Sequence, residues 1–127
     1  MTQVPEVSLI VRVDLGAHGR LGPGKMLLLE NIDALGSISA AGRAMNMSYR
    51  QAWELVDQLN KAFAEPVAAS QTGGKSGGGA SLTPFGHELV KCYRQIAAHA
   101  GQVAAADIAA IQGKLRPVDD VRGSGDS

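Results

Sequence analysis

The sequence has a single cysteine, no long apolar run and no excess of either charge. Cys92 alone cannot form a disulfide within the chain, which fits a reducing, cytoplasmic location. No stretch approaches the roughly 18 apolar residues of a membrane-spanning helix, and the N-terminus has no basic and apolar pattern of a secretory signal. Lys and Arg number 12, as do Asp and Glu. This balance does not exclude nucleic acid, because binding depends on where the charges lie.

Large apolar side chains are also few. Hydrophobic residues make up 45% of the 127 positions, but 19 of the residues are alanine. We therefore expect one small domain over residues 1–115 with a thin core, followed by a polar, disordered tail over 116–127. A thin core leaves a small domain marginally stable, so we expect a second subunit to contribute.

Apolar spacing predicts the elements in the first half of the chain. Alternation over 8–15 indicates one half-buried strand, and the glycines of 16–24 indicate a turn. A helix is expected over 25–35 and ends at Gly36. A short helix within 37–46, capped by Ser37 or Ser39, leads through a tight turn at Asn46 and Met47 to a longer helix over 49–63. The small core between these two helices is expected from Ile38, Ala41, Met45, Met47, Ala52, Val56 and Leu59.

The second half predicts a hairpin and a final helix. Residues 67–72 and 80–83 read as two strands joined by the glycine-rich tip 73–79. Pro84 suits a first helical turn, and the helix is expected to run to about Ile111. The fold class is therefore mainly α with a small β-hairpin (α+β). The order is that of a winged helix-turn-helix with a long flanking dimerisation helix.

This order predicts a DNA-binding face. The first turn of the longer helix would enter the major groove, where Arg50 can bond guanine and Tyr49 a phosphate or a thymine methyl. Glycine N–H groups and Lys75 at the hairpin tip would contact phosphates, which positions the protein without reading sequence. The predicted contact residues are Ser37, Ser39, Arg43, Ser48, Tyr49, Arg50, Gln51, Glu54, Gly74, Lys75, Ser76 and Gly77.

Other readings of the same residues are weaker. The string ASQTGGKS (69–76) matches a loose nucleotide-binding pattern, but the glycines after it oppose the helix that such a loop requires. His87, Cys92 and His99 lack the i, i+3 or i, i+4 spacing of metal ligands, and Cys92 reads as a buried apolar residue. Trp53 reads as a packing residue that supports the hairpin or the first strand. No catalytic set emerges, so we expect no enzyme, no cofactor and no metal.

Three blocks resemble the N-terminal domain of the molybdate-responsive, ModE-type transcriptional regulators. They are LLLENIDALGSIS (27–39), MSYRQAWELVDQLN (47–60) and TGGKSGGGASLTPFGHELVKCYRQI (72–96). The last is the most specific, since a glycine-rich tip leads into LTxxG and a helix. The first two blocks are also similar to the related domain of LysR-type regulators. The resemblance covers residues 8–100.

The resemblance implies a bacterial regulator that binds double-stranded DNA as a homodimer. Carried over by position, the helix contacts are Ser48, Tyr49 and Arg50, and the wing contacts are 74–78. The family's C-terminal molybdate-binding module has no counterpart here, so we expect no molybdate site within this chain; any molybdate response would require a separate protein.

Two functions remain open at this point. The first is a sequence-specific DNA-binding transcriptional regulator that binds palindromic operators. The alternative is a winged-helix protein-interaction module without its own operator, since the fold alone does not settle function.

Overall fold

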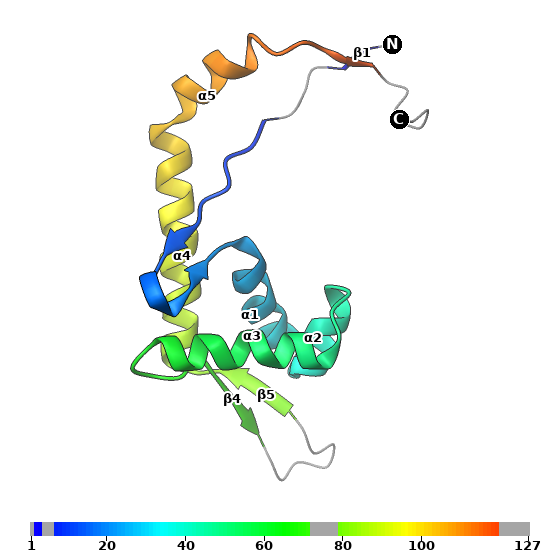
Figure 1. Ribbon diagram of the computed structural model, residues 1–127, viewed down its shortest axis with the longest axis vertical. Coiled ribbons are helices and arrows are strands. Elements are labelled where there is room, and N and C mark those ends of the chain that lie inside the picture. Colours follow the sequence, from blue (N-terminus) through cyan, green and yellow to red (C-terminus); the bar gives the residue numbers. More distant parts are fainter. Residues whose placement is uncertain (1, 4–6, 72–78, 120–127) are drawn as a thin grey trace. The chain divides into compact units, whose positions relative to one another are not determined.

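The computed structural model describes residues 2–3, 7–71 and 79–119. It divides into two compact units, residues 10–97 and a second unit of residues 1–9 with 98–127. Helices predominate among short antiparallel strand pairs (Figure 1), which confirms the mainly α, α+β class. The helices are α1 (Pro23–Leu35), α2 (Ile38–Ala44), α3 (Tyr49–Ala62), α4 (Pro84–Val103), α5 (Ala105–Gln112) and the short 3-10 helix η1 (Gly16–His18). The strands are β1 (Thr2–Gln3), β2 (Val13–Asp14), β3 (Arg20–Leu21), β4 (Ala68–Gln71), β5 (Gly79–Leu82) and β6 (Val118–Asp119).

The three helices expected over 25–35, 37–46 and 49–63 are present, but α1 begins at Pro23, two residues before its predicted start and within the expected turn. Pro23 opens α1, and Gly36 ends it in the left-handed region at φ 77°, where its N–H donates to the Ile32 carbonyl at 2.8 Å. Ser37 caps α2 by accepting a hydrogen bond from the Ala40 N–H at 2.9 Å. The tight turn expected between α2 and α3 is present, and Asn46 within it has a positive φ of 58°. The predictions for these helices are confirmed.

The single strand expected over 8–15 is wrong in length. The regular strand β2 covers two residues, paired with β3 in the register Val13↔Leu21 and Asp14↔Arg20. Since β3 is also two residues long, the backbone before Val13 has no strand to pair with among the described residues. The expected alternation holds over 11–15, where Val11, Val13 and Leu15 are half-buried and the residues between them are exposed. It fails at Leu9, which is 44% exposed. The region 16–24, expected as a turn, contains η1 and β3.

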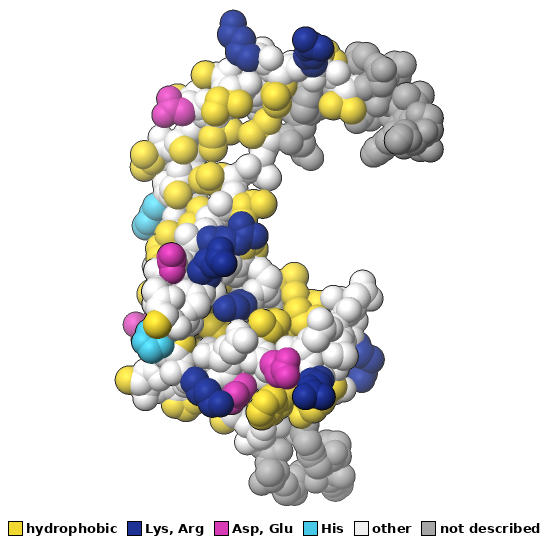
Figure 2. Space-filling view, in the orientation of Figure 1, with side chains coloured by type: hydrophobic (Ala, Val, Ile, Leu, Met, Phe, Trp, Pro, Cys, Tyr) yellow, Lys and Arg dark blue, Asp and Glu magenta, His cyan; other side chains and the backbone are white. Residues whose placement is uncertain are grey.

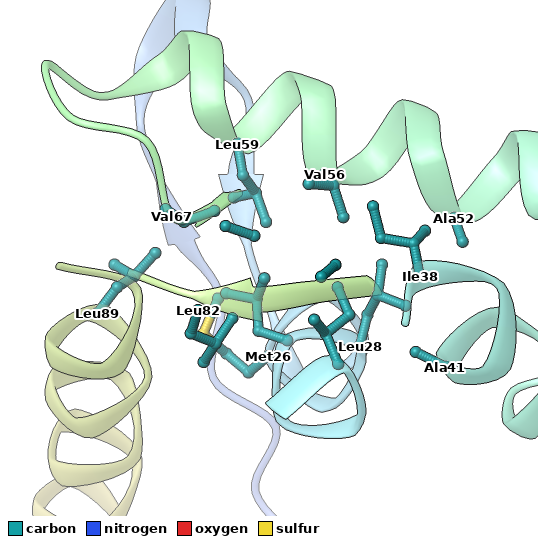
Figure 3. Close-up of a cluster of buried hydrophobic side chains, with 14 of the residues drawn as sticks. Met26, Leu28, Ile38, Ala41, Ala52, Val56, Leu59, Val67, Leu82 and Leu89 are labelled. Atoms are coloured by element: carbon teal, nitrogen blue, oxygen red, sulfur yellow. The ribbon is translucent and has the colours of Figure 1, made fainter. Parts of the chain in front are cut away.

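The core of the 10–97 unit lies between α3 on one side and α1, α2 and β5 on the other (Figure 3). Met26, Leu28 and Leu29 of α1 are fully buried. The expected contribution of the α2–α3 pair is confirmed, with Met45 and Met47 packed at its edge. The residues of that pair that are buried are Ile38, Ala41, Ala52, Val56 and Leu59. Apolar contact thus holds the two helices in a fixed relation.

One face of α4 closes this core. Leu89 and Tyr93 are buried, and the Tyr93 hydroxyl donates to the Val11 carbonyl at 2.6 Å. The prediction that Cys92 is buried is wrong, because its side chain is exposed. Consecutive residues lie about 100° apart around a helix, so the inward position of Tyr93 turns its neighbour Cys92 toward solvent.

Two ion pairs join α4 to α1. Arg94 donates to both oxygens of Glu30, at 2.6 and 3.1 Å, and this hydrogen bonding raises the pKa of the Arg94 guanidinium above its ordinary value. His87 Nε2 lies 3.7 Å from a carboxylate oxygen of Asp33, on the surface as expected. Both pairs are largely solvent-exposed, so each contributes less than about 1 kcal/mol.

The second unit contains the end of α4, helix α5 and the β1–β6 pair. The helix expected to reach Ile111 extends to Gln112 but is interrupted at Ala104, where ψ is 0°. Helical hydrogen bonding continues through the interruption, from the Ala104 N–H to Ala100 and from the Ile108 N–H to Ala104, both at 2.9 Å. Part of the expected tail 116–127 forms strand β6, and residues 120–127 lie outside the described part.

Among the described residues, no helix combines the length and the apolar character that a bilayer span requires.

Candidate nucleic-acid interface

The first turn of α3 is the expected reading surface, and a capping box holds it. Ser48 Oγ accepts from the Gln51 N–H at 3.1 Å, and Gln51 Oε1 accepts from the Ser48 N–H at 3.1 Å. The side-chain oxygens of Ser48 and Gln51, two predicted contact residues, therefore already accept hydrogen bonds within the protein. The Gln51 NH₂ group remains available as a donor.

Tyr49 and Arg50 extend from this turn into solvent. Tyr49 is 57% exposed, and the Arg50 side chain is 85% exposed. Arg50 Nε lies 3.4 Å from Glu54 one turn later, a long contact between exposed groups. Such i, i+4 pairs contribute about 0.3–0.5 kcal/mol, so Glu54 orients the guanidinium without fixing it.

The predicted residues of α2 take local roles. Ser37 is the half-buried cap of this helix. Ser39 accepts a hydrogen bond from the exposed Arg43 guanidinium at 2.9 Å. Arg43 therefore lies along the surface of α2, and the hydroxyl of Ser39 is engaged one turn before it.

A close approach of α2 and α3 lies at Gly42, a residue that sequence reasoning missed. Ala41 was expected in the small core between these two helices. Ala41 is fully buried, but it is a Cβ built on Gly42 that would lie 2.9 Å from the Ala52 Cβ. A glycine inside a predicted helix was the available signal, because its entropic cost there normally needs a packing reason.

The stem of the expected hairpin is present as the antiparallel pair β4–β5, with Ala68 opposite Leu82 and Gln71 opposite Gly79. The Ala80 N–H donates to the Gly36 carbonyl at 2.9 Å, which places the start of β5 beside the start of α2 (Figure 1). The predicted tip contacts Gly74, Lys75, Ser76 and Gly77 lie outside the described residues.

Three further residues that sequence reasoning missed fix the base of this hairpin. Asn60 of α3 accepts from the Val67 N–H at 2.7 Å and donates to the Ala68 carbonyl at 3.2 Å. Thr83 Oγ1 donates to the Pro66 carbonyl at 2.6 Å and accepts from the Gly86 N–H at 2.9 Å.

Gly86 allows the start of α4 to pass against β4. A Cβ there would meet the Val67 carbonyl oxygen at 2.0 Å. The LTPFG string therefore has a structural meaning, since its Thr83 and Gly86 form the joint at which the hairpin meets α4. An amide side chain toward the end of α3 and a threonine before a Pro-x-Gly were the signals for this joint.

Trp53 of α3 lies beside the hairpin. It is 46% exposed and lines a cavity of about 110 Å³ together with Ala69 and Ser70 of β4. Of the two packing partners expected for Trp53, the hairpin is therefore the one beside it.

The alternative chemistries gain no support from the described residues. The nucleotide-binding pattern requires a helix after its loop, whereas strand β5 begins at Gly79. Among the residues that the structure describes, no three His, Cys, Asp or Glu side chains gather where they could hold a metal ion.

Comparison with known proteins finds similarity to molybdenum-binding, molybdenum-transport and regulatory proteins. The chain is 46% identical over 79 residues to the molybdenum-pterin-binding protein MopB of Rhodobacter capsulatus, an alignment of 62% of this chain and 29% of MopB. It is 34% identical over 84 residues to the molybdenum transport protein ModE of Azotobacter vinelandii, which covers 66% and 31% of the two chains. It is 36% identical over 75 residues to the DNA-binding transcriptional dual regulator ModE of Escherichia coli K12, which covers 59% and 29%.

The chain is similar to ModE and Mop proteins. It spans about a third or less of the length of these relatives. No family model matches it. Relatives from Yersinia pestis and Escherichia coli K12 are named as transcriptional regulators.

Proposed function

We propose that the chain is a sequence-specific, double-stranded-DNA-binding transcriptional regulator that uses a winged helix-turn-helix. Helix α3 acts as the recognition helix, α2 as its support and the β4–β5 hairpin as the wing. The observation that carries the proposal is the exposed start of α3, with Tyr49 and Arg50 in solvent, in a chain similar to a DNA-binding transcriptional regulator. The proposal assigns no catalytic reaction to the chain.

Arg50 is the proposed base-reading residue. An α-helix fits the major groove of B-DNA, and residues at its start reach the base edges. A bidentate contact from arginine to guanine gives about 1–3 kcal/mol of discrimination. The exposed pair with Glu54 contributes about 0.3–0.5 kcal/mol, so guanine outcompetes the carboxylate. Glu54 then discriminates against misplaced phosphates by repulsion.

Lys75 and the neighbouring glycines are the proposed phosphate contacts of the wing. The hairpin stem is anchored to α3 and α4 at its base and lies beside the start of α2 at its outer end. The proposal assigns to Lys75 and these glycines the phosphates that flank the groove occupied by α3. Such contacts add affinity equally for all sequences.

A homodimer is the proposed assembly. In the second unit Val103 is 85% exposed and Ile111 is 61% exposed, on an alanine-rich helical segment. Small side chains permit close helix approach, and covering these apolar side chains with a second copy removes them from water. Two recognition helices about 34 Å apart would then read a palindromic operator.

Fluorescence anisotropy with operator fragments selected from genomic DNA tests the DNA proposal. With about four phosphates neutralised per protomer, the affinity of a dimer should fall with salt at a log–log slope of about −7. We expect Arg50→Ala to relax specificity at one base position and Lys75→Ala to weaken all duplexes alike and reduce the slope. Lys91→Ala, which removes an exposed cation from α4, is the matched control.

A slope near zero, or no binding to any duplex, would contradict the proposal and favour the protein-interaction module. The dimer has its own test by analytical ultracentrifugation. Replacing Val103 and Ile111 together by glutamate should shift the protein to monomers and weaken operator binding. An unchanged sedimentation coefficient at all concentrations would place the dimer contact elsewhere.

A further inference from the structure

A basic cavity of the 10–97 unit is not used by the proposed DNA interface. It has a volume of about 450 Å³ and lies where the β2–β3 hairpin meets the start of α1. Three cations line it, Arg12, Arg20 and Lys25, and the remaining lining residues are glycines and one proline. Figure 2 shows Lys and Arg side chains gathered over this part of the molecule. No acidic residue is among the lining residues.

The contacts of these three cations within the protein do not neutralise their charge. Lys25 Nζ donates to the Arg20 carbonyl at 2.7 Å, which leaves two ammonium protons for another acceptor. The Arg12 side chain passes within 3.4 Å of a Cβ built on Gly22. Within the described part of the chain, neither Arg12 nor Arg20 has an ion pair. Placing like charges together costs free energy, and an anion would recover it.

Asp14, an acidic residue on the same hairpin, does not take the place of such an anion. Asp14 lies across from Arg20 in the β2–β3 register, and its carboxylate accepts the Gly16 N–H at 2.9 Å. It does not line the cavity. The surroundings of the cavity therefore keep an excess of positive charge.

Backbone N–H groups beside the cavity, at the start of α1, also favour an anion. Gly22 precedes α1 and supplies no side-chain cap, and the first turn of α1 contains no acidic residue. The space above Gly24 is open, since a Cβ there meets nothing within 4 Å. N–H groups at the start of a helix favour an anion when cations are already present beside them.

We propose that this cavity binds a small tetrahedral oxyanion of the phosphate class. Guanidinium groups match phosphate oxygens with paired hydrogen bonds, and an ammonium group adds a point charge. Two guanidinium groups and one ammonium group belong to the lining residues, and this number of donors suits the four oxygens of phosphate better than the two of a carboxylate. The anion is a free ion or the phosphate of a small metabolite.

The cavity lies at the opposite end of α1 from the hairpin. The end of α1 is the part beside the hairpin, through the Gly36–Ala80 hydrogen bond. The cavity lies at the beginning of this 13-residue helix, about 20 Å away at 1.5 Å per residue. The proposal therefore does not depend on DNA binding.

Nuclear magnetic resonance tests the proposal directly. We would titrate the full, ¹⁵N-labelled chain with inorganic phosphate, keeping ionic strength constant with sodium chloride. The expected result is a saturating shift of the Gly22, Gly24 and Lys25 amide signals. Sulfate should give the same shifts, and acetate should bind about ten-fold more weakly, because it makes fewer charge-assisted hydrogen bonds.

Variants separate a defined site from general attraction. Arg12→Gln and Arg20→Gln should each weaken phosphate binding about ten-fold, since each removes a charge-assisted hydrogen bond. The spectra themselves report whether these variants fold. Lys91→Ala should bind phosphate as the unaltered chain does.

Three results would overturn the proposal. The first is a shift that rises linearly without saturation, and the second is phosphate binding by both arginine variants as tight as that of the unaltered chain. The third is a loss of affinity for random-sequence DNA in the arginine variants, equal to that of Lys75→Ala, without saturable phosphate binding. That result would make the cavity a contact for DNA phosphates.

Discussion

The joint between the hairpin and α4 gives the sharpest test of the fold, through Gly86→Ala. A Cβ at Gly86 would lie 2.0 Å from the Val67 carbonyl oxygen, whereas side-chain carbons essentially never approach closer than 3.0 Å. The start of α4 must therefore move by about 1 Å. The obstructing atom belongs to the backbone, so a change of rotamer cannot relieve the contact.

The expected change in the free energy of unfolding follows from two destabilising effects and one stabilising effect. Overpacking of this kind costs about 1–3 kcal/mol, and a rigid backbone neighbour puts it at the upper end. Moving α4 also weakens the cap in which Thr83 Oγ1 accepts the Gly86 N–H at 2.9 Å, a loss of about 1 kcal/mol. Alanine returns about 1 kcal/mol through its better helix propensity. We expect a net loss of about 3 kcal/mol in the free energy of unfolding.

The same helix supplies the matched control. Gly101 also lies in α4, but a Cβ there meets nothing within 4 Å. Gly101→Ala should therefore stabilise the protein by up to about 1 kcal/mol. Urea unfolding followed by circular dichroism measures both, with the midpoint shifting and the m-value unchanged. If Gly86→Ala were as stable as the unaltered chain, or if both variants shifted in the same direction, the close approach would be wrong.

The other predictions concern single hydrogen-bonding residues and use the same unfolding measurement. Asn60→Ala removes the amide that bonds the backbone of β4 and should cost about 2 kcal/mol, because two bonds of about 1 kcal/mol are lost; a change under 0.5 kcal/mol would contradict the joint. Ser48→Ala should cost about 1 kcal/mol through loss of the α3 cap, and a Ser48→Asp variant that fails to retain most of the stability would argue against capping as the cause. Tyr93→Phe leaves the Val11 carbonyl without its donor and should cost about 1 kcal/mol, unless residues 10–12 already detach in the unaltered chain, which hydrogen exchange would reveal.

Local patterns were sufficient for the helices. The stop at Gly36 and the cap at Ser37 are decided by neighbours within four residues, and the structure contains both. The hairpin stem followed from its flanking turn residues in the same way.

What the sequence could not supply depends on partners distant along the chain. The strand expected over 8–15 is limited by the two residues of β3, which no local pattern indicates. Cys92 and Tyr93 suit the inward position about equally, and the choice depends on the carbonyl of Val11, 82 residues earlier. The reach of Asn60 to β4 likewise becomes visible once α3 and the hairpin are packed together.

The candidate interface separates residues that hold the hairpin from residues proposed to read DNA. Thr83 and the amide of Asn60 hold the hairpin against α3 and α4 through short hydrogen bonds, and Gly86 allows an approach in which a Cβ has no room. Tyr49 and Arg50 extend into solvent and bear little of the fold's stability. Under the proposed function, substitution at the exposed pair changes which DNA is bound without unfolding the domain, whereas a change at the joint alters the angle of the hairpin stem for every DNA sequence.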